Sequence, residues 1–315
     1  SVEEARVIRD ASPQSPVLLL GYIPQHQLEE VLESGWSFVC SKREMLSWVM
    51  KRSTIDRPAK IHLEIETGLY RQGADQEELD AMLTLLESAG KRVVVEGICS
   101  HFASAEQVEN QDATEQQERL LREACAHVEA RGYAPRWRHI ACSAAIWLRA
   151  PGSWNAVRLG ISLYGIWSSA GVAEVATQQH SALVLTPALT WKTIVAEVKS
   201  VPNGAAIGYG GTERVTRATR LAVLPIGYAD GFDRRLSSRG EVLIRGARCR
   251  VVGRVCMNMC MVDVTDVPEV CVEDEVVLYG SQGSERVSPQ DTERQLANFI
   301  AYEAVAQLQA SIPRV

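Results

Sequence analysis

Two tyrosines flanked by glycines are the residues of this 315-residue chain whose setting best suits chemistry on a ligand. Tyr209 lies between Gly208 and Gly210, and Tyr228 follows Gly227 in the sequence Gly-Tyr-Ala-Asp-Gly. Because glycine has no Cβ, the backbone can turn sharply there and push a phenol outward. Such turns present the phenol O–H group to a ligand. Ordinary packing tyrosines at two hairpin tips are the alternative that the spacing leaves open.

A β-rich second half is expected to hold these tyrosines. The apolar run Leu221–Ile226 between them predicts a buried strand. From about residue 180 to residue 280, short apolar runs alternate with turn signals, which is typical of an antiparallel β-domain. Its other predicted strands are Trp191–Val198, Glu241–Ile244, Val251–Val255 and Met261–Val264. The stretch Ser288–Leu308 predicts one closing helix.

In the first half, strand-like runs alternate with amphipathic helices, which predicts a parallel sheet. The predicted strands are Val17–Leu20, Ser37–Cys40, Lys60–Glu66, Val93–Cys99, Arg138–Cys142 and Ala156–Leu159. Helices are predicted after Ser1 and near Gln27–Ser34, Lys42–Lys51, Gln76–Ala89 and Ala113–Arg131, with capping boxes at Ser1, Ser41 and Asp112. Such a sheet is either open and doubly wound or curled into a barrel.

Four polar side chains favour the barrel. They come at or just after the ends of four predicted strands, and they are Arg71, His101, Ser143 and Arg158. The carboxyl ends of the strands form the face where (β/α)8 barrels assemble their active sites. Six units in about 165 residues fall short of the ~250 residues of a full barrel, so the first two βα units are expected to be missing.

The composition fits a larger domain over residues 1–172 and, after a linker at residues 170–180, a β-domain over residues 173–315. The net charge of −6 gives no electrostatic case for nucleic acid, and no run approaches the ~20 apolar residues of a membrane span. The eight cysteines are scattered, which predicts free thiols in a reducing compartment. No histidine lies near Cys256 and Cys260, so core packing is favoured there over a metal site.

Several motifs, in order along the whole chain, resemble those of the alanine racemase family, which are pyridoxal-phosphate (PLP) enzymes of fold type III. The segments that carry the resemblance are Glu66–Gly73, Ser100–Ala103, Val157–Gly165, Ala206–Phe232, Gly253–Met259 and Ala301–Glu303. The first, for example, resembles the family pattern D-T-G-M-x-R-L-G. The resemblance implies a homodimer in the bacterial cytoplasm that interconverts L- and D-alanine with PLP and supplies D-alanine for peptidoglycan.

The resemblance also implies roles around the cofactor. Arg158 would contact the pyridine nitrogen, and because a guanidinium does not give up a proton, this contact favours racemisation over decarboxylation. Tyr209 would be one of two bases at the substrate Cα, serving the neighbouring subunit's site, and His101 would tune it. The residues implied to hold the phosphate are Ser143, the backbone of Gly160 and Ile161, and Tyr302.

For the substrate, the resemblance implies that Arg71 and the backbone N–H of Met257 bind the carboxylate. The residues implied for the entry corridor are Tyr228, Glu106, Arg234, Arg254 and Ile300. A racemase for serine, or one of broad specificity, is an alternative. The binding free energies of a methyl and a hydroxymethyl group in such a pocket differ by only ~1–3 kcal/mol.

Three departures from the family pattern stand out. Glu64 stands where many members carry a carbamylated lysine, and its charge is expected to position Arg71. Asn258 replaces an aspartate beside the substrate carboxylate. The lysine motif V-K-A-N-A-Y-G-H-G does not occur, and none of the six lysines is expected to follow a barrel strand in a suitable context.

The absent motif leads to an expectation about the chain as a whole. Its first residue is a serine, and it is expected to lack the family's N-terminal segment with the lysine that binds the cofactor, so that an export signal upstream stays open. We therefore expect the chain to be an inactive fragment by itself. A non-catalytic homologue that still binds PLP is the alternative.

Overall fold

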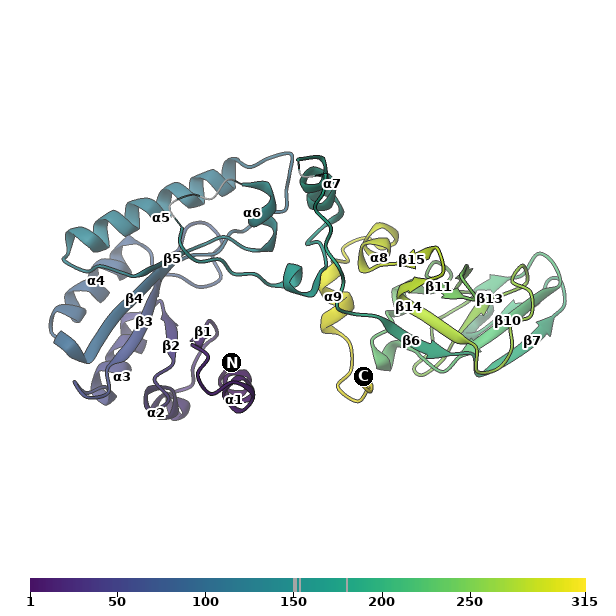
Figure 1. Ribbon diagram of the computed structural model, residues 1–315, viewed down its shortest axis with the longest axis horizontal. Helices are drawn as coiled ribbons and strands as arrows, with labels where there is room; N and C mark the ends of the chain where they lie inside the picture. The colour runs from purple at the N-terminus through teal and green to yellow at the C-terminus, as the bar shows by residue number, and fades with distance from the viewer. Residues whose placement is uncertain (150–151, 153, 180) are drawn as a thin grey trace. The chain divides into compact units, whose positions relative to one another are not determined.

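The computed structural model describes residues 1–149, 152, 154–179 and 181–315. The chain divides into two compact units, Ser1–Leu159 and Gly160–Val315 (Figure 1). This division lies before the predicted boundary at residue 172. The reason is that Ile161 and Ile166 pack in a small apolar cluster with Ala301, so the segment after Gly160 belongs to the second unit.

Unit 1 is built on a parallel sheet whose five strands, among the described residues, follow one another in chain order. The strands are β1 (Leu18–Leu19), β2 (Ser37–Cys40), β3 (Ala59–Glu64), β4 (Val93–Cys99) and β5 (Trp137–His139). Helices lie along the outer side of this curved sheet (Figure 1). A doubly wound sheet reverses its strand order part-way, so the uninterrupted order is that of a (β/α) barrel.

Five of the six α-helices described in unit 1 match a predicted position, whereas the one at Ser143–Leu148 was not predicted. They are α1 (Val2–Ala11), α2 (Leu28–Glu33), α3 (Arg43–Arg52), α4 (Gln76–Glu87), α5 (Asp112–Ala130) and α6 (Ser143–Leu148). The capping box at Ser1 is confirmed, since its side chain accepts from the Glu4 N–H. The boxes at Ser41 and Asp112 are wrong. Ser41 lies outside α3, and Asp112 is already inside the first turn of α5.

The predicted sixth strand at residues 156–159 is also wrong. Within the described part of this segment the backbone makes one parallel bridge, between Cys142 and Arg158. Because α6 begins at Ser143, no further extended residue is left beyond Cys142 to continue the pairing. The bridge nevertheless places Arg158 beside the end of β5.

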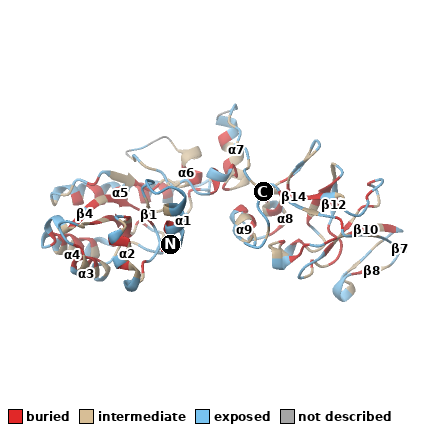
Figure 2. Ribbon diagram, turned by 60° about the horizontal axis from the view of Figure 1, so that its bottom comes forward, coloured by how far each residue is buried: buried red, intermediate tan, exposed pale blue. Residues whose placement is uncertain are grey.

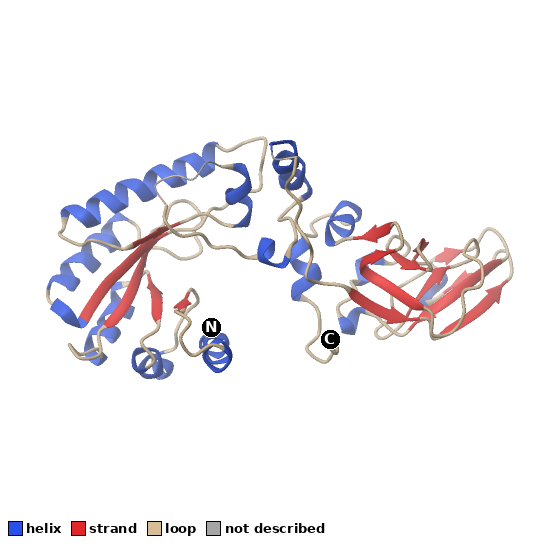
Figure 3. Ribbon diagram, in the orientation of Figure 1, coloured by secondary structure: helices blue, strands red, loops and turns tan. Residues whose placement is uncertain are grey.

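Unit 2 confirms the predicted antiparallel β-domain, because every strand pair recorded in it is antiparallel (Figure 3). One sheet has the order β13-β10-β7, another has β12-β11-β14-β15 with β6 beside β14, and β8 pairs with β9. The strands are β6 (Trp191–Ile194), β7 (Glu197–Val201), β8 (Ala206–Ile207), β9 (Glu213–Arg214), β10 (Thr219–Leu224), β11 (Glu241–Ile244), β12 (Ala247–Arg250), β13 (Cys260–Asp263), β14 (Glu275–Gln282) and β15 (Glu285–Val287).

Three local predictions for unit 2 are corrected. The expected linker at 170–180 contains a helix, α7 (Ala170–Gln179), because Val172 and Ala176 bury one of its faces. The expected closing helix is two helices, α8 (Pro289–Gln295) and α9 (Ala301–Ala306), separated by a left-handed residue at Asn298. The expected strand Val251–Val255 makes a single bridge at Val251, since Gly253 at φ +74° turns the chain away.

Each unit buries its own apolar residues, which gather on the strands and on the helix faces turned toward them (Figure 2). In unit 1, Phe38, Ile61 and Leu63 are fully buried on β2 and β3. In unit 2 the core includes Trp191, whose ring lies 5.8 Å from that of Tyr279. No helix in the described residues is long and apolar enough to span a bilayer.

Candidate active site

Arg158 is the centre of a buried polar cluster in unit 1. Its side chain is 11% exposed, and its Nη1 lies 3.9 Å from Glu64 Oε1. Its Nε–H donates to His139 Nδ1 at 3.0 Å. Its Nη2 is buried and has no hydrogen-bond partner among the described residues. Because an unpaired buried donor costs ~1–3 kcal/mol, this atom fits the acceptor of a ligand.

His101 follows β4 and also keeps one unpaired atom. Its Nδ1 is buried without a hydrogen-bond partner in the part of the chain that the structure describes. Burial, and then the charges of Arg158 and Arg71, lower the pKa of His101 to about 4. The ring is therefore neutral at pH 7, where it can both donate and accept a hydrogen bond.

The loops after β3 and β4 are tied together by hydroxyls, which brings the segments of Arg71 and His101 side by side. Ser100 Oγ–H donates to Ile65 O at 2.8 Å, and Ser100 Oγ lies 2.7 Å from Thr67 Oγ1. These bonds are buried, so they hold the two loops firmly. The loops after β3 and β4 therefore lie together, while a common site for the side chains of Arg71 and His101 stays a prediction.

Arg71 lines a cavity of about 480 Å³ at the carboxyl ends of β2 and β3. The Glu66 carboxylate accepts the N–H of Gly68 at 2.5 Å and that of Tyr70 at 2.9 Å, which shapes the loop before Arg71. Lys42 lines the same cavity and follows the end of β2 by two residues. Lys42 therefore follows a barrel strand, while the expectation that no lysine does so in a context suited to the cofactor stays a prediction.

Glu64 is placed differently from the sequence expectation. It is 4% exposed, and its contacts are with Arg158 and with the Gln72 side chain, whose Nε2–H donates to Oε2 at 3.3 Å. Burial raises its pKa, while the charge of Arg158 and, after it, that of Arg71 act in the opposite direction. The closest cation to Glu64 in the described contacts is thus Arg158, and Arg71 acts on it through its charge alone.

The residues predicted to hold a phosphate fall in both units. Ser143 is the first residue of α6 in unit 1 and is 2% exposed. Gly160 precedes the short helix η3 (Ile161–Tyr164) in unit 2, where Ile161 is buried. Tyr302 lies on α9 of unit 2 and is 38% exposed. Their common role stays a prediction.

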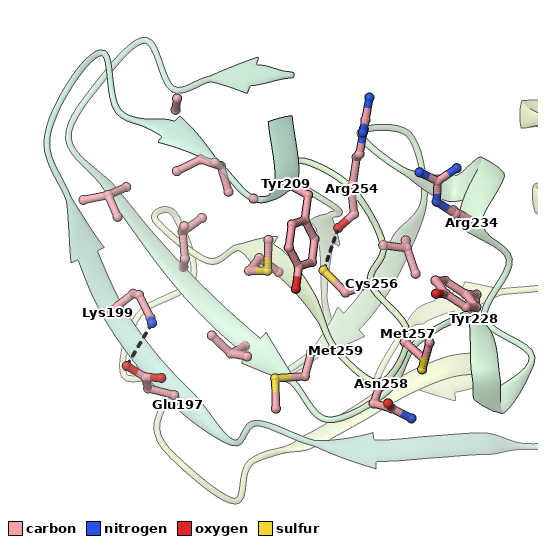
Figure 4. Close-up of a pocket in the computed structure, with 18 residues that line it drawn as sticks. Glu197, Lys199, Tyr209, Tyr228, Arg234, Arg254, Cys256, Met257, Asn258 and Met259 are labelled. Atoms are coloured by element: carbon pink, nitrogen blue, oxygen red, sulfur yellow. Dashed lines mark hydrogen bonds and ion pairs between the residues drawn. The ribbon is translucent and has the colours of Figure 1, made fainter. Parts of the chain in front are cut away.

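A cavity of about 940 Å³ in unit 2 brings both glycine-flanked tyrosines together with Met257. Tyr209 is 72% exposed, and Figure 4 shows its hydroxyl pointing into the cavity. Gly208 at φ +69° and Gly210 at φ +74° have positive φ values, which form the sharp turn that the sequence predicted around Tyr209. Local glycine chemistry therefore exposes this phenol.

Tyr228 reaches the cavity because two loops come into very close contact. Its backbone N–H donates to Cys256 O at 3.0 Å, and the Ala229 N–H donates to Met257 O at 2.9 Å. A Cβ on Gly227 would lie 2.2 Å from Cys256 O, so only glycine permits this approach.

The cavity also collects part of the predicted entry corridor. Arg234 and Arg254 line it together with Asn258, and Figure 4 shows all three around Tyr228 and Met257. Glu106 belongs to unit 1, and Ile300 is not among the residues of this cavity. On the opposite wall Lys199 Nζ pairs with Glu197 Oε1 at 3.0 Å.

Sequence patterns did not single out His139, His62 and Glu96. His139 and His62 connect to Arg158 through hydrogen bonds, and Glu96 lies 3.6 Å from His62. Both histidines are 3% exposed. Their signal in the sequence is weak, because a histidine within an apolar strand is usually a satisfied core residue. The spacing His62-x-Glu64 on one strand was the available clue, since alternate residues of a strand share a face.

The chain thus has a barrel-type sheet with cationic and neutral polar groups at its strand ends, followed in sequence by an antiparallel domain that exposes a phenol. A family model described as the alanine racemase N-terminal domain matches residues 1–168, and one described as the C-terminal domain matches residues 188–315. The chain belongs to the alanine racemase family.

Individual relatives agree with this assignment. An alanine racemase of Symbiobacterium thermophilum is 38% identical over 315 residues, which cover 100% of this chain and 81% of the relative. One of Leptospira interrogans is 34% identical over 318 residues and is covered to 80%. The crystal structure of alanine racemase from a D-cycloserine producing Streptomyces lavendulae has a TM-score of 0.92 at 30% identity, with coverage of 100% of this chain and 81% of that one.

Proposed function

We propose that this protein binds PLP at Arg158 and uses Tyr209 as one of two bases in the racemisation of alanine. The observation that carries the proposal is the buried, unpaired Nη2 of Arg158 in a chain of the alanine racemase family. The pairing of this atom with the nitrogen of a pyridine ring would remove the cost of burying it. The unpaired Nδ1 of His101 nearby supports a polar ligand at the same place.

PLP, when bound, supplies an electron-withdrawing ring that makes the Cα proton of an amino acid more acidic. Arg158 would donate an N–H to the ring nitrogen and keep its own protons, which leaves that nitrogen unprotonated. Tyr209 would take a proton from Cα, or return one to it, on one face of the substrate. Arg71 would hold the substrate carboxylate by charge-assisted hydrogen bonds.

The remaining roles follow the same family pattern. Hydroxyls and backbone N–H groups suit a phosphate where few lysines are at hand. We assign the phosphate to Ser143, the backbone of Gly160 and Ile161, and Tyr302, and we assign Met257 and Tyr228 to the substrate. The L- and D-alanine assignment over serine rests on the named relatives.

We further propose that Tyr209 serves the site of a second subunit in a homodimer. Its support is the position of Tyr209 at an exposed turn of unit 2, while Arg158 and His101 belong to unit 1. An exposed phenol on a separate unit is suited to complete a site elsewhere.

The second base, which the family motif supplies as a lysine, has no such counterpart among these residues. The family's lysine motif does not occur in the sequence. We propose that the chain by itself binds PLP without a covalent bond and racemises alanine near background, since loss of a base costs ~10²–10⁴-fold in rate. Lys42, beside Arg71, is the lysine whose position would allow it to act instead.

The test is a PLP titration of the purified chain, followed by absorbance and equilibrium dialysis. Arg158→Ala should weaken binding roughly tenfold to a hundredfold, by loss of a hydrogen bond from a charged donor. Arg122→Ala, on the exposed side of α5, is the control and should bind like the parent. Equal PLP affinity in Arg158→Ala and the parent chain would refute the proposed site.

Borohydride reduction and D-alanine formation are followed in the same samples. No reducible adduct and background racemisation are expected. Rapid racemisation that is abolished by Lys42→Met would show that Lys42 is the second base. Rapid racemisation that survives this change would refute the proposed reason for inactivity.

A further inference from the structure

A series of polar groups, of which the two histidines are buried, leads away from Arg158 through His139 on β5 and His62 on β3 to Glu96 on β4. Arg158 Nε–H donates to His139 Nδ1 at 3.0 Å. His139 Nε2 lies 2.8 Å from His62 Nδ1, and His62 Nε2 lies 3.6 Å from Glu96 Oε2. Ser37 Oγ–H in turn donates to this carboxylate. The proposed chemistry uses only the first member of this series.

The register of the sheet explains how His62 on β3 reaches His139 on β5. The strand between them, β4, presents Gly97 opposite His62. A Cβ at Gly97 would lie 2.3 Å from His62 Nδ1, so the absence of a side chain is what lets the ring cross β4. Cys99, two residues further on, pairs with His139.

A bulge in β4 places the carboxylate at the other end. Ile61 pairs with Val95 and His62 pairs with Gly97, so Glu96 is the extra residue with no partner on β3. An extra residue of this kind re-aims its side chain relative to the regular alternation of a strand. Glu96 can therefore contact both His62 and Ser37, which lie on two other strands.

In the series from Arg158 to Glu96, each N–H donor faces the next group along the series. This order fixes the tautomer of each histidine ring. The Nε of an arginine always carries its proton, so His139 Nδ1 must accept and its proton must be on Nε2. His139 Nε2–H then donates to His62 Nδ1, which leaves the proton of His62 on Nε2, facing Glu96. A second proton on His139 would sit on Nδ1 and displace Arg158.

The surroundings keep this arrangement in one protonation state. Burial, then the charges of Arg158 and His62, lower the pKa of His139 to about 3. Burial also lowers the pKa of His62, while Glu96 acts against it. Both rings are therefore neutral at pH 7, and the Glu64 carboxyl group lies 3.9 Å from the Arg158 guanidinium.

We infer that His139, His62 and Glu96 are positioning residues that hold the Arg158 guanidinium in one orientation, so that Nη2 is kept for the cofactor. This inference rests on the proposed role of Arg158 toward PLP. His139 accepts the Nε–H of Arg158, and Glu64 lies 3.9 Å from Nη1 of the same guanidinium. Rotation of the guanidinium would break its hydrogen bond to His139. His62, which is in contact with Glu96, holds the His139 ring in the orientation that accepts this bond.

The test compares two substitutions of His62. His62→Phe keeps a ring over Gly97 but removes the hydrogen bonds, whereas the amide of His62→Gln can accept from His139 and donate to Glu96. PLP affinity should fall roughly three- to tenfold in His62→Phe and stay within about twofold of the parent in His62→Gln. A packing role would favour phenylalanine at a site this buried. Equal PLP affinity in the two variants would overturn the inference.

A second measurement needs no cofactor. In the chain labelled with ¹⁵N in its histidines, a two-bond N–N coupling should connect His139 Nε2 and His62 Nδ1. Gly97→Ala, which blocks the crossing ring, should abolish it, and Glu123→Gln on the exposed side of α5 should leave it unchanged. Absence of the coupling in the parent chain would refute the hydrogen bond between His139 and His62, and with it the inference. A present coupling, with PLP affinity insensitive to Arg158→Ala, would instead refute the proposed cofactor site.

Discussion

His101 and Glu64 respond in opposite ways to burial near the same arginine. Burial disfavours the charged form of each group, so it lowers the pKa of His101 and raises that of Glu64. The charge of Arg158 lowers the pKa of both groups. For His101 this effect adds to that of burial, and for Glu64 it opposes that of burial. At pH 7 the histidine is therefore neutral and can both donate and accept a hydrogen bond.

The lowered pKa of His101 predicts a pH dependence of stability. In the unfolded chain a histidine titrates near ~6.5, whereas folded His101 titrates at about 4. Between these values the unfolded chain binds the extra proton, so the free energy of unfolding rises with pH, by up to ~1.4 kcal/mol per unit. The partial exposure of the ring makes the measured slope smaller.

Urea unfolding of the parent chain, His101→Asn and His26→Asn between pH 4.5 and 7.5 checks this prediction. His26→Asn is the control, because His26 is exposed in the short helix Gln25–Gln27. His101→Asn should reduce the rise with pH, and the curves should run parallel above pH ~6.5, where the unfolded histidine has lost its proton. An unchanged slope in His101→Asn would contradict the pKa shift.

At the scale of elements, the loop after β10 decides where Tyr228 and Met257 lie. The loop packs against the backbone of residues 256–257 without space for any side chain at Gly227, whose Cβ would be 2.2 Å from Cys256 O. Both loops line the large cavity of unit 2. The spacing of these two backbones therefore fixes the geometry of the cavity wall.

Gly227→Ala is expected to destabilise unit 2 by ~1–3 kcal/mol, because the added methyl forces two backbones apart. Gly21→Ala is the matched control, since a Cβ there meets nothing within 4 Å. The free energies of unfolding from urea titrations give the comparison. A Gly227→Ala chain as stable as the control would mean that the two loops separate at little cost.

At the scale of the whole molecule, the exposed turn of Tyr209 predicts a homodimer in which that surface is covered. Tyr209 is 72% exposed and Met257 is 56% exposed in the single chain. Exposed apolar and aromatic groups gathered at one cavity are typical of an interaction site. The 34.7 kDa chain should sediment as a dimer at high concentration.

Hydroxyl-radical footprinting over a range of protein concentrations tests this prediction directly. Oxidation of Tyr209 and Met257 should decrease as the dimer fraction from sedimentation increases. Ile55, which is 67% exposed between α3 and β3, should be oxidised equally at all concentrations. Dimerisation without protection of Tyr209 would mean that another surface forms the interface and that Tyr209 does not act across it.

The sequence by itself determined the local elements and the exposed phenols. The bounds of β2, β4 and β11 agree with the predicted strands, because apolar runs between turn signals are local patterns. The sharp turn around Tyr209 was predictable for the same reason, since a glycine's freedom does not depend on distant residues. The family motifs added the expected roles of Arg158, Arg71 and His101, which local patterns do not contain.

The tertiary structure alone decided which side chains meet. His62 and His139 are 77 positions apart, and their contact depends on the register of three strands and on Gly97 between them. Likewise Glu64 lies against Arg158 because β3 and the segment after β5 end at the same edge of the sheet. Register and bulges are set by the pairing of whole strands, so no local pattern in the sequence fixes them.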